Sequence, residues 1–478
     1  MSEETADQDV RTEQHDPAVP EAYAAFMRTG WDEREADVER HPLADLAASR
    51  RARLAEAFPG ERLVLPAGGY KVRAYDTDYR FRPDTAHTYF CGNQTSDAVL
   101  VIDTDHSGGA EAVLYARPRS GRDSDEFFRD RQYGALWAGK RPSAGELEAA
   151  LGLPVRPVSS LEEALGSGSG VKTRVHRGVS ADVDRLVAGD AGRDAELARV
   201  ASELRLVKDA WELDELDAAV RATALGFEDC VREWPGVLEH GERWLEGTFF
   251  RRARTMGNDL GYDSIVAGGS HATTLHWIEN SGPIVPGELV LLDLGVEGHN
   301  LYTADVTRTL PVSGTFTPLQ RDLYSLVLQA QEAGLAALRP GARFLAGHEA
   351  AMAVLAHGLG DLGLLPVPVE EALSPDSRVY ARWTLHGTSH MLGMDVHDCG
   401  QAAPDSYRDG VLAEGMVLTV EPGLYFQADD LLVPEELRGI GIRIEDDVAV
   451  TADGVRNMSA SLPRTPDAVE AWMAELRG

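Results

Sequence analysis

Cysteine is scarce in this chain, with three residues in 478. Cys91, Cys230 and Cys399 stand far apart and form no paired-cysteine motif, which argues against a disulfide framework and against a cysteine-based zinc site. Long apolar runs are missing too, since stretches such as Leu289 to Leu292 are too short to span a bilayer. The first 21 residues are acidic and polar and lack the basic start and apolar segment of a secretory signal. We therefore expect a cytoplasmic protein that does not associate with membranes.

Positive charge is also in short supply. The chain has 46 lysines and arginines against 78 acidic residues, which gives a formal net charge of −32. Such a surface repels phosphate backbones, so nucleic acid is not an expected partner. Solubility is the preferred explanation of this charge, but acidic residues are also ligands for hard cations. Only the position of an acidic residue distinguishes a cation ligand from a solvated surface residue.

The length exceeds what one compact core usually holds, so two domains are expected. Residues 1–44 are rich in Glu, Asp and Ala and are interpreted as an acidic extension that is partly disordered or loosely helical. Residues 45–207 predict an α/β domain with strands at 62–68, 97–103 and 111–117, helices at 143–152 and 159–166, and a flexible glycine-serine loop at 166–170. An amphipathic helix over 208–234 opens the second domain, residues 208–478.

Two aspartates of the second half stand in unusual settings. Asp293 ends an apolar run that predicts a buried strand, where a carboxylate is costly unless it is paired or bound to a cation. Asp305 lies in a β-branched run twelve positions later, a separation that two neighbouring strands can bridge. Taken alone, each aspartate is more often a turn or cap residue than a ligand.

Three further stretches add histidines and glutamates. His386, His390 and His397 fall within thirteen residues and are interleaved with glycine, which suggests a site that backbone or substrate approaches closely. Glu421 ends another strand-like run. Arg443 and Glu445 are two positions apart and share a face if they lie on one strand. A surface ion pair on an edge strand is the alternative for this last pair, although the flanking isoleucines and valines favour a partly buried strand.

Carboxylates and imidazole without thiolates suit manganese, zinc, cobalt or iron. Four carboxylates and one histidine are enough for two ions when carboxylates bridge them. Two ions that share a water lower its pKa and supply hydroxide near neutral pH, which is chemistry suited to hydrolysis.

In combination, these stretches resemble the pita-bread metallopeptidases, and among them the Xaa-Pro aminopeptidase (aminopeptidase P) family. The resemblance extends over roughly residues 45–478 and rests on HGTSHMLGMDVHD (386–398), VLTVEPGLY (417–425) and GIRIEDDVAVT (441–451), with YRFRPDTAHTYFCG (79–92) and LWAGKRPS (136–143) in the first domain. It implies a creatinase-like α/β N-terminal domain followed by a pita-bread α+β catalytic domain.

The resemblance also implies roles for individual residues. The implied metal ligands are Asp293, Asp305, His390, Glu421 and Glu445. The implied catalytic residues are Glu421, His397, His276 and His386, with His276 on the substrate side and the other two histidines steadying the scissile carbonyl and its tetrahedral intermediate. The implied substrate-binding residues are Arg443, Tyr262, Tyr425 and Trp137, the last of which reaches a neighbouring subunit's active site in some relatives.

The implied activity is removal of the N-terminal residue from peptides with proline in the second position, by a hydroxide that bridges two divalent ions. Glu421 would take the proton of the water and pass it to the leaving proline nitrogen, while His397 and His276 stabilise the oxyanion. Mn²⁺ is the expected ion, with Zn²⁺, Co²⁺ or Fe²⁺ as alternatives. The expected assembly is a homo-oligomer, a dimer or a tetramer.

Four alternatives share this scaffold. Prolidase has the same fold and ligands but prefers Xaa-Pro dipeptides, and methionine aminopeptidase normally lacks both the large N-terminal domain and the RIED motif at 443–446. A non-catalytic binding protein and metal-free, creatinase-like hydrolysis are both disfavoured by the complete ligand set. The spacing from Asp293 to Asp305 is one residue longer than in close relatives, and we expect the extra residue in a hairpin loop at 297–303.

Overall fold

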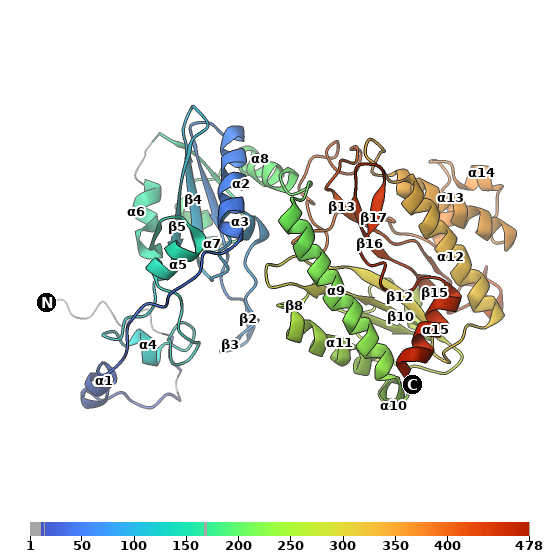
Figure 1. Cartoon of the computed structure of the whole chain (residues 1–478), viewed down its shortest axis with the longest axis horizontal. Coiled ribbons are helices and arrows are strands. Elements are labelled where there is room, and N and C mark those ends of the chain that lie inside the picture. Colours follow the sequence, from blue (N-terminus) through green and yellow to red (C-terminus); the bar gives the residue numbers. More distant parts are fainter. Residues whose placement is uncertain (1–10, 14, 167–169, 478) are drawn as a thin grey trace. The chain divides into compact units, whose positions relative to one another are not determined.

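The computed structural model describes residues 11–13, 15–166 and 170–477. The chain forms two compact units, Met1–Ala201 and Ser202–Gly478, and this division lies close to the domain limit proposed at 207/208 (Figure 1). Residues 1–10 and 14 of the predicted extension, and most of the predicted glycine-serine loop at 166–170, lie outside the described residues. Among the described residues, no helix combines the length and the apolar character that a membrane span requires.

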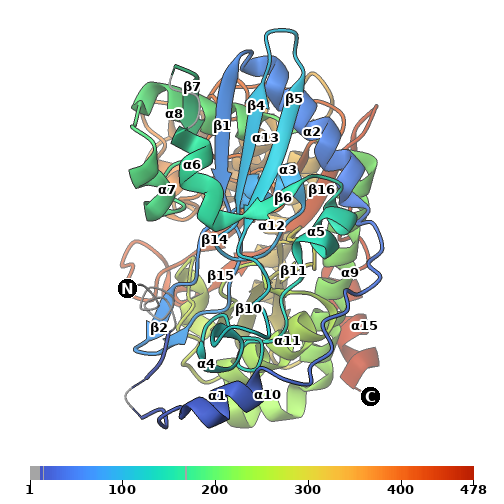
Figure 2. The ribbon, with the colours of Figure 1, turned by 90° about the vertical axis from the view of Figure 1, so that its left-hand side faces the viewer.

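The first unit is built on a five-stranded mixed sheet with the strand order β6-β5-β4-β1-β7. Its strands are β1 (Glu61–Pro66), β4 (Val99–Thr104), β5 (Ala110–Ala116), β6 (Val155–Pro157) and β7 (Lys172–Val175). Successive side chains point to opposite faces, so Val64, Val99 and Val101 pack on one side against α6 (Leu161–Gly166) and α7 (Ala181–Leu186). Helices α2 (Leu43–Ala57) and α3 (Thr85–Cys91) also pack on this sheet, whose strands stand side by side in Figure 2. The predicted α/β character of this unit is confirmed.

The predicted strands and helices of the first unit are present, with ends shifted by a few residues. The predicted helix at 143–152 is α5 (Ala144–Leu151), which begins with a reciprocal cap between Ser143 and Glu146 and ends at Gly152 in the left-handed region. Part of the predicted extension forms α1 (Glu21–Met27). The extension also contacts the rest of its unit, since Arg131 forms an ion pair with Asp16. The described part of the extension is thus partly helical and is bonded to the rest of its unit.

Helices cover short strands in the second unit, and most of these strands are buried. The predicted amphipathic helix at 208–234 is α9 (Ala210–Arg232), and it packs against α11 (Glu242–Met256). Farther along the chain, α12 (Pro318–Ala337) packs against α13 (Ala346–Asp361) (Figure 1). One large apolar core joins these helices to the strands between them.

Two three-stranded sheets form the centre of the second unit. In the first, β10 (Leu289–Leu294) lies between β9 (Ile265–Gly268) and β12 (Val306–Pro311). In the second, β16 (Asp446–Val450) lies between β13 (Val417–Val420) and β17 (Val455–Asn457). The two-stranded pair of β14 (Gly423–Tyr425) and β15 (Gly441–Arg443) adjoins them. Between β10 and β12 the chain turns back at 298–302, where the Gly298 N–H donates to Tyr302 O, so a turn lies within the range 297–303.

Candidate active site

Sheet register brings the predicted ligands together in pairs. Asp293 lies in β10 and Asp305 directly precedes β12, and these two strands are antiparallel neighbours. Val420 of β13 pairs with Asp446 of β16, which sets Glu421 and Glu445, each one residue beyond this pair, at the same end of the second sheet. A hydrogen bond of 3.1 Å from the Glu445 N–H to Thr307 O joins the two sheets.

Two details of the predicted strands differ from the structure. Asp305 lies just outside β12, because its N–H donates to the Asp447 carboxylate at 3.0 Å rather than to a neighbouring strand. Arg443 and Glu445 do not share one strand. The chain leaves β15, which pairs with β14, and joins β16, which pairs with β13, so strand pairing is interrupted at Ile444 and Glu445. Both side chains nevertheless face the same cavity.

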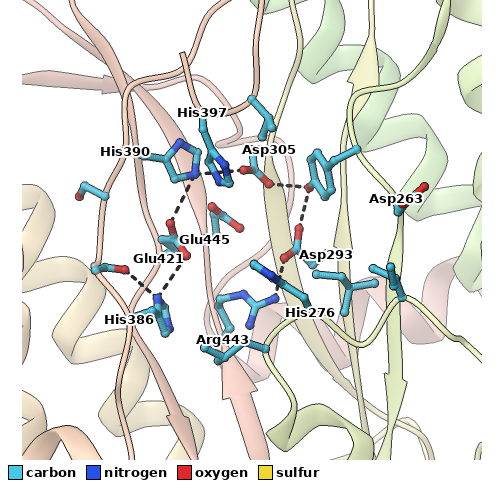
Figure 3. A pocket seen from close by; sticks show the side chains of 17 residues that line it. Asp263, His276, Asp293, Asp305, His386, His390, His397, Glu421, Arg443 and Glu445 are labelled. Carbon is cyan, nitrogen blue, oxygen red and sulfur yellow. Dashed lines mark hydrogen bonds and ion pairs between the residues drawn. The ribbon is translucent and has the colours of Figure 1, made fainter. Parts of the chain in front are cut away.

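A cavity of about 560 Å³ collects nearly all the candidate residues (Figure 3). Of the predicted residues, those that line the cavity are Tyr262, His276, Asp293, Asp305, His386, His390, His397, Glu421, Arg443 and Glu445. Tyr425 stands behind this lining. Trp137 belongs to the first unit, where its ring is half exposed, its indole N–H donates to Phe128 O and the Arg131 guanidinium lies 4.5 Å above it.

Tyr262 and Arg443 hold the two aspartates. The Tyr262 hydroxyl lies 2.6 Å from Asp293 Oδ1 and also contacts Asp305 Oδ1. On the other side of Asp293, the Arg443 guanidinium donates to Oδ2 at 2.5 Å. Burial and the charges of both aspartates raise the pKa of Tyr262 well above its ordinary value, so this phenol stays protonated and serves as a donor.

His390 lies between Asp305 and Glu421. Its Nε2 is 3.3 Å from Asp305 Oδ2 and 3.5 Å from Glu421 Oε1. Burial opposes a charge on this ring, but the bond to Asp305 and the negative charge of Glu421 outweigh it and raise the pKa of His390 to about 9. Burial, with a contribution from Asp305, raises the pKa of Glu421 to about 7 even though His390 acts in the opposite direction. His390 and Glu421 therefore both tend to hold a proton, and a cation bound to them would displace these protons.

Glu445 is held by a threonine. The Thr307 hydroxyl donates to Glu445 Oε2 at 2.6 Å and accepts from Nε of Arg443 at 3.1 Å. Arg308 donates to the backbone oxygen of Glu445 at 2.6 Å and forms an ion pair with Asp446 beneath the site. Burial and the neighbouring carboxylates raise the pKa of Glu445 well above its ordinary value.

This donor set fits divalent cations. Asp305, His390 and Glu445 each offer one ligand atom, and these atoms lie within 4.8 Å of one another. The pKa values of Asp305, Glu421 and Glu445 are all raised, because burial and mutual repulsion disfavour so many negative charges in one place. Bound cations remove that repulsion and return these groups to their ionised, ligating forms.

Three histidines surround the carboxylates. Nε2 of His386 is 2.8 Å from the Tyr425 hydroxyl, which in turn accepts from Arg443 at 3.0 Å. Burial and the nearby Arg443 lower the pKa of His386 to about 3, so its imidazole is neutral. His397 packs edge-on against His390, and burial together with that charged ring lowers its pKa as well. His276 projects from the opposite side of the cavity (Figure 3).

Several residues around this site were not predicted from the sequence. Thr307 is two positions after Asp305 and therefore shares its face, which is the signal that could have identified it. Asp263, which follows Tyr262 and is exposed at the cavity, carried no comparable signal. The apolar side chains Ile265, Leu275, Ile278 and Val396 also line the cavity, and no pattern in the sequence separates them from ordinary core residues.

Comparison with known proteins places both units. The model of metallopeptidase family M24 matches residues 214–452, half of the chain, and the model of the aminopeptidase P N-terminal domain matches residues 47–176. Xaa-Pro aminopeptidase 2 of Streptomyces coelicolor is 52% identical over 467 residues, covering 97% of this chain and 98% of that protein. Xaa-Pro aminopeptidase of Escherichia coli is 32% identical over 447 residues, covering 90% of this chain and 97% of that protein.

Solved structures agree with these matches. An alanine variant of Escherichia coli aminopeptidase P superposes with a TM-score of 0.81 at 30% identity, over 93% of this chain and all of that one. The same enzyme with the inhibitor Pro-Leu gives a TM-score of 0.79 at 31% identity. The predicted architecture, an aminopeptidase P type N-terminal domain followed by a pita-bread domain, is thereby confirmed. The chain belongs to metallopeptidase family M24, among the Xaa-Pro aminopeptidases, and is a metal-dependent hydrolase.

Proposed function

We propose that this cavity releases the first residue from peptides whose second residue is proline. We further propose that two divalent ions are held there by Asp293, Asp305, His390, Glu421 and Glu445. The observation that carries the proposal is the convergence of four largely buried carboxylates on one cavity, where Arg443 and His390 form ion pairs with them. Relatives and structural neighbours named as Xaa-Pro aminopeptidases support the choice of substrate.

The chain's own residues would divide the work around the scissile bond. Divalent ions held by the five proposed ligands would lower the pKa of a bound water and so supply a hydroxide nucleophile near neutral pH. Glu421 would take the proton of that water and deliver it to the leaving proline nitrogen, a role supported by its position in the cavity lining next to His390. His276 and His397 would donate hydrogen bonds to the oxyanion. Neutral His386, held by Tyr425, would orient the scissile carbonyl.

Further proposals concern the metal, the assembly and the compartment. Manganese fits the oxygen-rich donor set, and zinc, cobalt or iron would also be accepted. A homo-oligomer in which Trp137 approaches a neighbouring subunit is supported by the exposure of its ring. A cytoplasmic location is supported by the three cysteines, all of them buried and unpaired, as expected under reducing conditions.

A metal and peptide panel tests the proposed activity. The chain is stripped with a chelator, reloaded with Mn²⁺, Zn²⁺ or Co²⁺, and assayed on an Xaa-Pro tripeptide, an Xaa-Pro dipeptide and a tripeptide with alanine in the second position. Release of the first residue from the tripeptide with proline, restored by metal, is the expected result. Preference for the dipeptide would instead indicate a prolidase, and failure with every metal would refute the proposal.

The Glu421→Gln variant tests the proposed proton carrier. Turnover is expected to fall by about 10²- to 10⁴-fold, because the amide cannot accept the proton. Metal content, measured by mass spectrometry, separates loss of this role from loss of ligands. Glu414→Gln, at an exposed position just before β13, is the matched control and should behave like the parent.

A further inference from the structure

Glu242, the first residue of α11, has a fully buried side chain and does not line the cavity. Its carboxylate is nevertheless completely bonded. Oε1 accepts from the Gly268 N–H at 2.8 Å and contacts Nδ1 of His271 at 2.7 Å. Oε2 accepts from the Trp277 indole N–H at 3.0 Å and from the Gly282 N–H at 2.6 Å. The cost of burying this charge is thus offset by four directed contacts.

These partners mark out a single loop. The chain leaves β9 at Gly268, passes through 269–282 and returns to Gly282, whose backbone oxygen accepts from the Glu242 N–H at 3.0 Å. The His271 ring stacks on Trp277 with ring centres 3.9 Å apart. A methyl group added at Gly282 would collide with the His271 ring, so the packing here tolerates no extra atoms. One carboxylate thereby holds both ends and the middle of the loop.

The same loop forms one side of the cavity. Leu275, His276 and Ile278 all line it, and they flank the Trp277 that Glu242 holds. His276 is exposed, and its ring makes no hydrogen bond or ion pair with any residue that the structure describes. The position of the His276 ring is therefore set by the backbone of the loop. The adjacent residue, Trp277, anchors that backbone through its hydrogen bond to Glu242.

We propose that Glu242, His271 and Trp277, called here the Glu242 cluster, are positioning residues that hold His276 at the distance from the ligand residues that turnover requires. This inference rests on the proposed function, which gives His276 its part in stabilising the oxyanion. A displacement of about 1 Å at such a group can cost on the order of 100-fold in rate, so a remote cluster that fixes a loop matters to the reaction.

Two variants disturb the Glu242 cluster to different degrees. Glu242→Gln replaces one acceptor oxygen by a donor that faces existing N–H groups, and Trp277→Phe removes one hydrogen bond while keeping an aromatic ring against His271. We expect kcat/KM to fall by about 10-fold or more in Glu242→Gln and by about 3-fold in Trp277→Phe. Metal content should be unchanged. Glu239→Gln, the same substitution at an exposed position close to the start of α11, should match the parent.

A double-mutant cycle with His276→Ala shows whether the cluster acts through His276. Once the imidazole is absent, Trp277→Phe and Glu242→Gln should each change kcat/KM by less than about 2-fold, because there is nothing left to misplace. If Glu242→Gln does not yield folded protein, the cycle is completed with Trp277→Phe. The same fold-loss in both backgrounds, or no loss in the parent background, would overturn the proposal.

Hydrogen exchange separates failure of this proposal from failure of the proposed function. Segments covering 268–282 should exchange faster in both variants, whereas β10 and β16 should stay protected. If His276→Ala alone leaves turnover intact, the role of His276 in the proposed function is wrong, yet the exchange data still report whether the Glu242 cluster fixes the loop. Unchanged exchange in the loop would refute the cluster itself.

Discussion

Two of the surfaces that line the cavity are held in different ways, and residues 386–397 form a third. The strand wall consists of the residues at the ends of β10, β12, β13, β15 and β16, and the loop wall belongs to the loop 269–282. Side chains of the strand wall are largely buried and bonded to one another, as with Thr307, Glu445 and Arg443. His276 on the loop wall is exposed and has no such bond among the described residues. Hydrogen bonds among its own side chains thus hold the strand wall in place, whereas hydrogen bonds to Glu242 hold the loop wall.

The largest effect should come from breaking the strand wall at a ligand. Asp305→Asn weakens the site for cations, and we expect activity to fall by about 10³-fold or more, equivalent to roughly 4 kcal/mol of barrier. Metal content and peptide turnover are measured together. Asp322→Asn, exposed on α12, is the control. A variant that keeps both metal and turnover would show that Asp305 is not a ligand.

The loop wall is tested by His276→Ala. Loss of one donor to the oxyanion should lower kcat by about 100-fold, with little change in metal content, because among the described residues its ring forms no hydrogen bond or ion pair with a proposed ligand. Steady-state kinetics at saturating metal provide the measurement, and His357→Ala, exposed on α13, is the control. Loss of metal in His276→Ala would mean that the two walls are less independent than their contacts indicate.

A milder change to the strand wall is Thr307→Val, which keeps the side-chain shape but removes the hydroxyl between Glu445 and Arg443. We expect about a 10-fold loss in metal affinity or activity, since partners of ligand side chains usually contribute on that scale. Thr307→Ser retains the hydroxyl and should recover most of the loss. If serine and valine behave alike, the hydrogen bonds of Thr307 are not what orients Glu445.

The smallest effect is expected at Asp263, an exposed carboxylate at the cavity. Its negative charge attracts the cationic amino end of a peptide, so Asp263→Asn should raise KM by about 2- to 3-fold at low salt, with kcat unchanged. The difference should shrink as the salt concentration rises. Glu279→Gln, an exposed acid of the loop 269–282 that does not line the cavity, provides the comparison.

The sequence predicted the strand wall far better than the loop wall. A carboxylate at the end of an apolar run, such as Asp293 or Glu421, is a charged residue among apolar neighbours, and this can be recognised from the sequence alone. Glu242 gave no such signal, because it lies in a polar stretch at the start of a helix and is buried only through contacts with a loop some thirty residues away. The interruption of the strand between Arg443 and Glu445 was not predicted, because it arises from pairing with two different partners. The chain before it pairs with β14, and the chain after it pairs with β13.

The hydrogen bond between the Glu445 N–H and Thr307 O has a consequence for how the protein matures. Each central sheet carries only two of the four proposed carboxylate ligands, so neither can grip a pair of cations before the other has docked against it. Metal uptake would then be one of the last events of folding and would lock the two halves of the domain in place. Chains synthesised without metal should accumulate as partly folded intermediates in which the strands are formed but the two central sheets are not stably packed together.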